Sequence, residues 1–70
     1  MRHERFIFRK ACGRIEVLEQ IDDHPPYVVD DVMYDEDYVC RAVARSGRPT
    51  AKQLREITNG GDELLVVERM

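Results

Sequence analysis

The sequence has no apolar run that could cross a membrane, because each of its hydrophobic stretches is short. A membrane-spanning helix needs about 18 or more consecutive apolar residues. The amino-terminal stretch MRHERFIFRK also lacks the apolar core of a secretory signal. We therefore expect a soluble, cytoplasmic protein that forms a single domain over residues 1–70.

Cysteine and histidine are scarce as well, with two of each. Cys12 and Cys40 are too few for a disulfide scaffold, and in a reducing cytosol we expect free thiols. The sequence has neither the paired spacing that zinc requires nor a calcium-loop pattern. The stretch NGGDE follows a predicted helix and has no adjacent lysine, which excludes a phosphate-binding loop. With no nucleophile motif either, we expect a non-enzymatic protein without metal or cofactor.

Lysine and arginine are absent from residues 15–40, although this stretch holds nine acidic residues. Residues 1–14 carry five basic residues and one acid, and residues 41–55 carry five basic residues and no acid. The net charge of −3 therefore conceals blocks of alternating sign. Such blocks indicate either an interaction surface or pairing between blocks within the fold.

Alternating hydrophobic residues predict strands near both ends of the chain. RFIFRKA and RIEVLEQI each show a period of two, and Gly13 supplies a turn between them, which predicts a β-hairpin. The second segment also fits a short helix. YVV, which follows two prolines, is typical of a short edge strand. The apolar run in ELLVVER predicts a central strand, because it could be buried on both faces.

Two helices are predicted between these strands. The first begins at Asp35, a suitable N-cap, and ends at Gly47. An earlier start at Asp30 or Asp31 is the alternative.

The second helix begins at Thr50, where TAKQ forms a capping box, and ends at NGG. Its buried side is expected to contain Ala51, Leu54 and Ile57. The element order β-β-(β)-α-α-β predicts an α+β fold. We expect a small, mainly antiparallel sheet with both helices packed on one of its faces.

The acidic stretch DDHPPYVVDDVMYDEDY spans residues 22–38 and holds seven carboxylates. Turns and helix starts favour single acids, but they do not explain why no base compensates them. Acids two residues apart in an extended chain lie about 6–7 Å apart, which can resemble a phosphate backbone. Our leading hypothesis is an interaction protein that blocks the basic, nucleic-acid-binding surface of a partner protein. The residues assigned to this surface are Asp22, Asp23, Asp30, Asp31, Tyr34, Asp35, Glu36, Asp37 and Tyr38.

In size and charge layout, the chain resembles the small inhibitors carried by phages and mobile elements, such as anti-CRISPR and anti-restriction proteins. These inhibitors share no common sequence. The resemblance therefore implies an inhibitory, non-enzymatic role and assigns no particular residues.

The basic segment leaves a second hypothesis open. GRPTAKQLREI resembles the first helix of a helix-turn-helix motif, but TNGGDELLVV stands where the recognition helix would follow. The alternative function is a small nucleic-acid-binding regulator. Its binding residues would be Arg41, Arg45, Arg48, Lys52 and Arg55. A further alternative is an antitoxin-like or structural subunit, and the sequence leaves both monomer and homodimer open.

Overall fold

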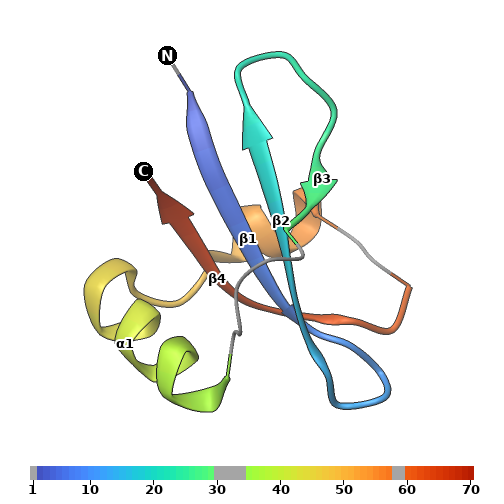
Figure 1. Cartoon of the computed structure of the whole chain (residues 1–70), viewed down its shortest axis with the longest axis vertical. Helices are drawn as coiled ribbons and strands as arrows, with labels where there is room; N and C mark the ends of the chain where they lie inside the picture. Colours follow the sequence, from blue (N-terminus) through green and yellow to red (C-terminus); the bar gives the residue numbers. More distant parts are fainter. Residues whose placement is uncertain (1, 30–34, 58–59) are drawn as a thin grey trace.

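A computed structural model describes residues 2–29, 35–57 and 60–70 (Figure 1). Four strands form one antiparallel sheet in the order β3-β2-β1-β4, and two helices accompany it. The elements are β1 (His3–Arg9), β2 (Ile15–Ile21), β3 (Tyr27–Val28), α1 (Glu36–Ser46), α2 (Ala51–Glu56) and β4 (Glu63–Arg69). The predicted α+β class and element order are confirmed.

The predicted β-hairpin forms the middle of the sheet. Ile7 of β1 lies opposite Val17 of β2, and both side chains are buried. The turn is closed by Gly13, whose backbone N–H donates to the Lys10 carbonyl at 2.8 Å. Gly13 has a φ of 91°, a left-handed conformation that glycine adopts without a steric penalty. The segment RIEVLEQI therefore forms a strand, as its period-two pattern predicts, and not the alternative short helix.

The two helices lie on opposite faces of the sheet, so the expectation that they share one face is wrong. On one face, Val39 and Ala42 of α1 pack against Ile7 and Val17. On the other face, Ile57, which follows α2, packs against a separate apolar cluster. That cluster consists of Phe6, Phe8, Leu64 and Val67, with Leu18 beside it. The strand periodicity makes both faces of β1 apolar, so each face needs its own cover.

Strand β4 lies at an edge of the sheet, which corrects the expectation of a central strand. Its burial comes from the helices: Leu65 and Val66 pack in the α1 cluster, whereas Val67 faces the other side. The segment that joins α1 to α2 passes beside β4 on its way between the two faces (Figure 1). At the opposite edge, β3 is short and follows two prolines, as predicted.

Helix α1 starts and ends where the sequence predicts. Asp35 is the N-cap, and its Oδ1 accepts a hydrogen bond from the Tyr38 backbone N–H at 2.9 Å. At the other end, the Gly47 N–H donates to the Val43 carbonyl at 2.7 Å. The alternative start at Asp30 or Asp31 lies outside the described residues.

Helix α2 has the predicted capping box but packs poorly. The Gln53 N–H donates to Thr50 Oγ1 at 3.2 Å, and the Thr50 N–H donates to Gln53 Oε1 at 2.9 Å. None of the residues Ala51–Glu56 is buried, and Leu54 is 47% exposed. The predicted buried side is therefore wrong for Ala51 and Leu54, whereas Ile57 does contact the sheet. Neither helix in the described ranges is long and apolar enough to span a membrane.

Candidate functional site

Bases from residues 1–14 form ion pairs with three of the nine acids of residues 15–40 in the described part of the chain: Glu16, Glu19 and Glu36. The register of β1 and β2 is one cause, because it sets Arg5 directly opposite Glu19. The ion pairs join Glu16 to Lys10 and to Arg14 (both 3.8 Å), Glu19 to Arg5 (3.0 Å), and Glu36 to Arg9 (2.7 Å). Charge blocks that are separate in sequence therefore mix in space, at least over this half of the molecule.

Glu19 is the most strongly held of these carboxylates. The Tyr27 hydroxyl donates to Glu19 Oε2 at 2.5 Å, while His3 Nε2 and Arg5 Nε lie 2.5 Å and 3.0 Å from Oε1. The Tyr27 and His3 hydrogen bonds, together with Arg5, lower the pKa of Glu19 to about 2, against the opposing effect of burial. The same Tyr27 bond raises the pKa of that phenol. This cluster joins β1, β2 and β3 and is structural.

The acids assigned to the partner-binding surface have different fates. Asp22 accepts a hydrogen bond from the Arg2 backbone N–H at 2.8 Å, and Asp35 caps α1. Asp23 and Asp37 are exposed and form no hydrogen bond or ion pair within the described part of the chain. Asp30, Asp31 and Tyr34, which are also predicted to belong to this surface, lie outside the described residues.

Tyr38 is half-buried and faces the core. An anchor role is expected of Tyr34 and Tyr38 only if they do not face the core, so it does not apply to Tyr38. Its ring packs against the α1 cluster, and its hydroxyl donates to Glu68 Oε2 at 3.0 Å. Arg45 lies over the same ring, 5.9 Å from its centroid, and donates through Nη2 to Glu68 Oε1 at 2.8 Å. Glu68 is 4% exposed, and a carboxylate so buried needs such partners. Arg45 therefore has a structural role besides any binding role.

The basic residues gather around a groove beside β4. Arg45 reaches it from the end of α1, Arg48 from the interhelical segment and Arg69 from the end of β4. The hollow measures about 420 Å³, and none of its described lining residues carries a carboxylate. Its other lining residues are Ser46, Pro49, Thr50, Gln53 and Val67. We refer to this hollow as the arginine groove.

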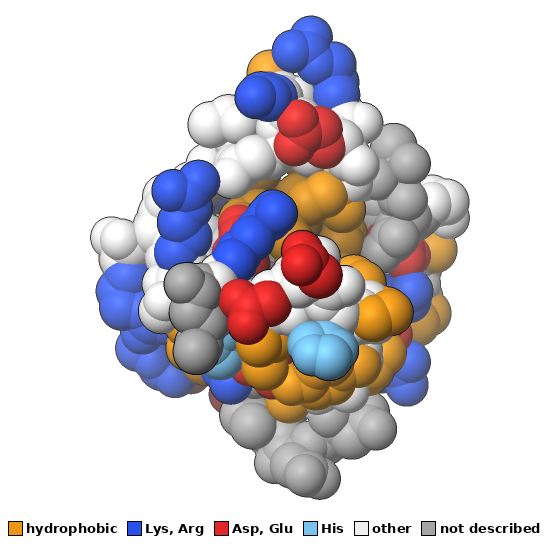
Figure 2. All heavy atoms as spheres, turned by 90° about the horizontal axis from the view of Figure 1, so that it is seen from above, with side chains coloured by type: hydrophobic (Ala, Val, Ile, Leu, Met, Phe, Trp, Pro, Cys, Tyr) orange, Lys and Arg blue, Asp and Glu red, His pale blue; other side chains and the backbone are white. Residues whose placement is uncertain are grey.

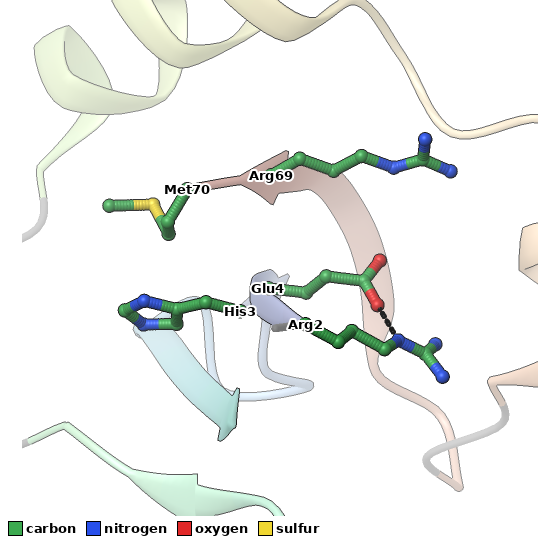
Figure 3. Close-up of a pocket in the computed structure, with 5 residues that line it drawn as sticks. All are labelled: Arg2, His3, Glu4, Arg69 and Met70. Atoms are coloured by element: carbon green, nitrogen blue, oxygen red, sulfur yellow. Dashed lines mark hydrogen bonds and ion pairs between the residues drawn. The ribbon is translucent and has the colours of Figure 1, made fainter. Parts of the chain in front are cut away.

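Arg48 and Arg69 have no acidic partner among residues 2–29, 35–57 and 60–70. Figure 3 shows that Arg69 extends to the same side as Arg2 and Glu4, with His3 and Met70 on the other side. The Glu4 carboxylate is already bonded to Arg2 Nε, which leaves Arg69 without an ion pair. Two of the three groove arginines therefore form no ion pair with a described residue, although Glu4 lies opposite Arg69 and a second hollow places Glu36 and Glu63 near Arg48.

The other basic residues predicted to bind nucleic acid are Arg41, Lys52 and Arg55, and none of them lines the arginine groove. Lys52 lines an adjoining hollow that shares Thr50, Gln53 and Arg69 with the arginine groove, and it lies 4.0 Å from Glu56. Arg41 and Arg55 are exposed and line neither hollow. In Figure 2, which looks onto the end of the molecule that carries both termini, blue side chains gather along the left flank and at the top of the view.

Sequence reasoning missed Arg69. It stands among acids, in a segment with four acidic residues and one base, so its local surroundings carry no binding signal. Its role depends on β4 lying at the sheet edge where the interhelical segment passes. A prediction of that edge position could have found it.

The groove is suited to binding more than to bond-breaking. Arginine guanidinium groups donate hydrogen bonds and stay protonated, so they do not serve as general bases. Within the described ranges, no three His, Cys, Asp or Glu side chains are grouped as metal ligands. Cys12 and Cys40 are free and exposed, and neither lines the groove.

The chain matches no protein-family model, no curated protein and no solved structure. The function of the chain is therefore inferred from the geometry and charge of the site itself.

Proposed function

We propose that this protein is a non-enzymatic binding protein that binds nucleic acid through the basic residues of segment 41–55 and the arginine groove. One observation carries the proposal: Arg48 and Arg69 line a groove with Arg45, neither forms an ion pair with a described residue, and no carboxylate is among the described lining residues of that groove. Clustered like charges repel one another, so groove arginines that form no ion pair with a described residue favour an anionic partner.

Phosphate is the anion that best fits such a cluster. The planar guanidinium group offers paired N–H donors that match two phosphate oxygens at once. A polymer of phosphates also releases bound counterions when arginines replace them, which adds to the affinity at low salt. The net charge of −3 opposes this attraction at long range, so we expect binding to be confined to the basic side of the molecule.

Fluorescence anisotropy with a labelled duplex DNA and a labelled RNA strand tests this proposal. If the three groove arginines each contact one phosphate, the logarithm of the affinity should fall with the logarithm of salt with a slope of about −2.7. Raising salt from about 50 to 200 mM would then weaken binding roughly 40-fold. A protein that binds neither nucleic acid at the lowest salt would overturn the proposal.

The acidic-surface inhibitor is the second candidate. Asp23 and Asp37 are the observation in its favour, because both are exposed and neither has an ion pair in the part of the chain that the structure describes. The exposed Tyr27 could add contact area beside Asp23.

Capture of a basic protein from nuclease-treated lysate, lost when Asp23 and Asp37 are changed to lysine, would favour this second candidate. Capture of nucleic acid alone, lost on nuclease treatment, would exclude it. The same changes at Asp23 and Asp37 should leave the fold intact, because neither carboxylate forms a hydrogen bond or ion pair with a described residue and Asp23 interacts with Arg2 only at longer range.

A further inference from the structure

We infer that the arginine groove is a phosphate-binding subsite in which Arg48 and Arg69 contact the phosphate oxygens and Arg45 completes the site. The inference rests on the proposed function, but it confines phosphate contact to the groove and excludes Arg41 and Arg55, which are equally exposed members of residues 41–55. It therefore replaces a basic helical surface with one localised site, built from three elements that are distant in sequence.

The position of Arg45 is set before any ligand arrives. Its Nη2 bonds Glu68 at 2.8 Å, and its guanidinium group lies over the Tyr38 ring. A guanidinium group has five N–H donors, so this contact leaves others for a ligand. A side chain that is already held in place loses less conformational entropy on binding.

The polar groups around the arginines present donors more than acceptors. The Thr50 and Gln53 side-chain oxygens each accept a backbone N–H in the capping box. The Thr50 hydroxyl proton and the Gln53 amide protons remain available, as does the Ser46 hydroxyl. A rim of donors without a described carboxylate matches a ligand rich in acceptor oxygens, as a phosphate group is.

The dimensions of the groove restrict what it can hold. A hollow of about 420 Å³ lies near the lower end of the range for small-molecule sites. It can take a phosphate with part of its sugar, but not the width of a duplex. The adjoining hollow shares Arg69 with the groove, but Glu4 and Glu56 line it beside Arg2 and Lys52. The groove alone, therefore, has a lining of cations and neutral groups among the described residues.

No exposed aromatic ring among the described lining residues offers a stacking surface in either hollow, because Phe6 is buried. Stacking on aromatic rings is a main source of base contacts in single-strand binding. The subsite should therefore contact the phosphate backbone and ignore base identity.

Two double variants of equal charge test the localisation. R48Q/R69Q removes the two groove arginines that form no ion pair with a described residue, and R41Q/R55Q removes two exposed arginines outside the groove. On a labelled duplex DNA, R48Q/R69Q should reduce the salt slope by about 1.8 and lower the affinity at low salt by about tenfold or more. R41Q/R55Q should lower the affinity by less than about threefold, because it changes only long-range charge.

Equal losses in the two variants would overturn the inference while leaving the proposed function in place. Thermal unfolding should show the same midpoint for both variants. If R48Q/R69Q has a lower midpoint than R41Q/R55Q, the single variant R48Q is used in its place, because Arg48 lies on the exposed interhelical segment.

The source of the phosphate is resolved by NMR on the full chain labelled with ¹⁵N. Inorganic phosphate, a mononucleotide and a duplex DNA are titrated separately, with sodium chloride of equal ionic strength as the control. Saturable shifts of the Arg48 and Arg69 Nε–Hε signals with all three phosphate ligands support the subsite. Shifts with inorganic phosphate or the mononucleotide but no binding of duplex DNA would support the subsite for free phosphates and overturn the nucleic-acid proposal. Signals that respond no differently to phosphate than to chloride would overturn the subsite.

Discussion

The two basic blocks of this protein have equal numbers of basic residues but differ in how many form ion pairs: in the second block only Arg45 and Lys52 do so with a described residue. In the first, residues 1–14, Arg5, Arg9 and Lys10 form ion pairs with acids of other elements. In the second, residues 41–55, Arg41, Arg48 and Arg55 have no ion pair among the described residues.

Strand pairing explains part of the difference, because it sets Arg5 opposite Glu19. Arg9 instead pairs with Glu36 of α1, and Lys10 pairs with Asp62. β1 lies in the middle of the sheet, so each of its side chains has a neighbour on both sides. The second block lies on helix surfaces and on a linker, where outward-facing side chains meet solvent. Equal charge in the sequence can therefore serve stability in one place and remain available for binding in another.

The largest effect on stability should come from Glu19, whose carboxylate has three side-chain hydrogen-bond partners. Replacing Glu19 with alanine should lower the free energy of unfolding by about 2 kcal/mol, because Tyr27, His3 and Arg5 lose their acceptor in a mostly buried position. Urea unfolding followed by circular dichroism measures it. Asp37→Ala is the matched control and should change stability by less than about 0.5 kcal/mol. Equal costs for the two variants would contradict the contrast.

The stability that Glu19 and Asp62 contribute should also depend on pH. The folded-state pKa of Glu19 is about 2, below its ordinary value of 4.5. A depressed pKa contributes stability that is fully present above about pH 4.5 and is lost as the pH falls toward 2. Asp62, whose pKa is lowered by its hydrogen bond to Lys10, acts in the same direction. Urea unfolding between pH 5 and 2 should show this decline, and Glu19→Gln should flatten it; an unchanged slope in that variant would assign the decline to other groups.

A direct comparison of one arginine from each block should give a smaller difference. Arg5→Gln should cost about 1 kcal/mol of unfolding free energy, because it removes a charged hydrogen bond to the mostly buried Glu19. Arg48→Gln should stay within about 0.5 kcal/mol, since its side chain has no ion pair to lose among the described residues. Thermal or urea unfolding of the two variants side by side measures the difference. A larger cost for Arg48→Gln would mean that the groove arginine is structural.

The smallest effect should come from Lys52, whose contact with Glu56 spans 4.0 Å between two exposed side chains. Lys52→Gln should change the free energy of unfolding by no more than about 0.5 kcal/mol. Hydrogen exchange of the α2 amides is the more sensitive measurement, because this helix buries none of its residues. Added salt should abolish even this small difference, and a difference that persists at high salt would contradict its electrostatic origin.

Much of the local structure could be predicted. The hairpin follows from period-two alternation around Gly13, and the helix starts follow from Asp35 and Thr50, whose side chains cap the backbone within three residues. The hydrogen-bond partner of the Tyr38 hydroxyl could not be predicted, because it is Glu68, thirty positions further along the chain. Leu54 was misassigned because helical spacing indicates which side chains share a face but not how closely that face approaches the sheet.

The sequence by itself therefore determined the elements, their order, the starts of both helices and the end of α1, because these depend on residues within a few positions of one another. The end of α2 differs from the prediction: its C-cap is Ile57, ahead of the expected stop at NGG. Tertiary structure decided which charges remain free. The register of β1 against β2 sets Arg5 opposite Glu19, and the crossing of the chain between the two faces brings Arg48 beside Arg69. Both depend on contacts between segments far apart in sequence, where the position of each side chain is set by how sheet and helices pack.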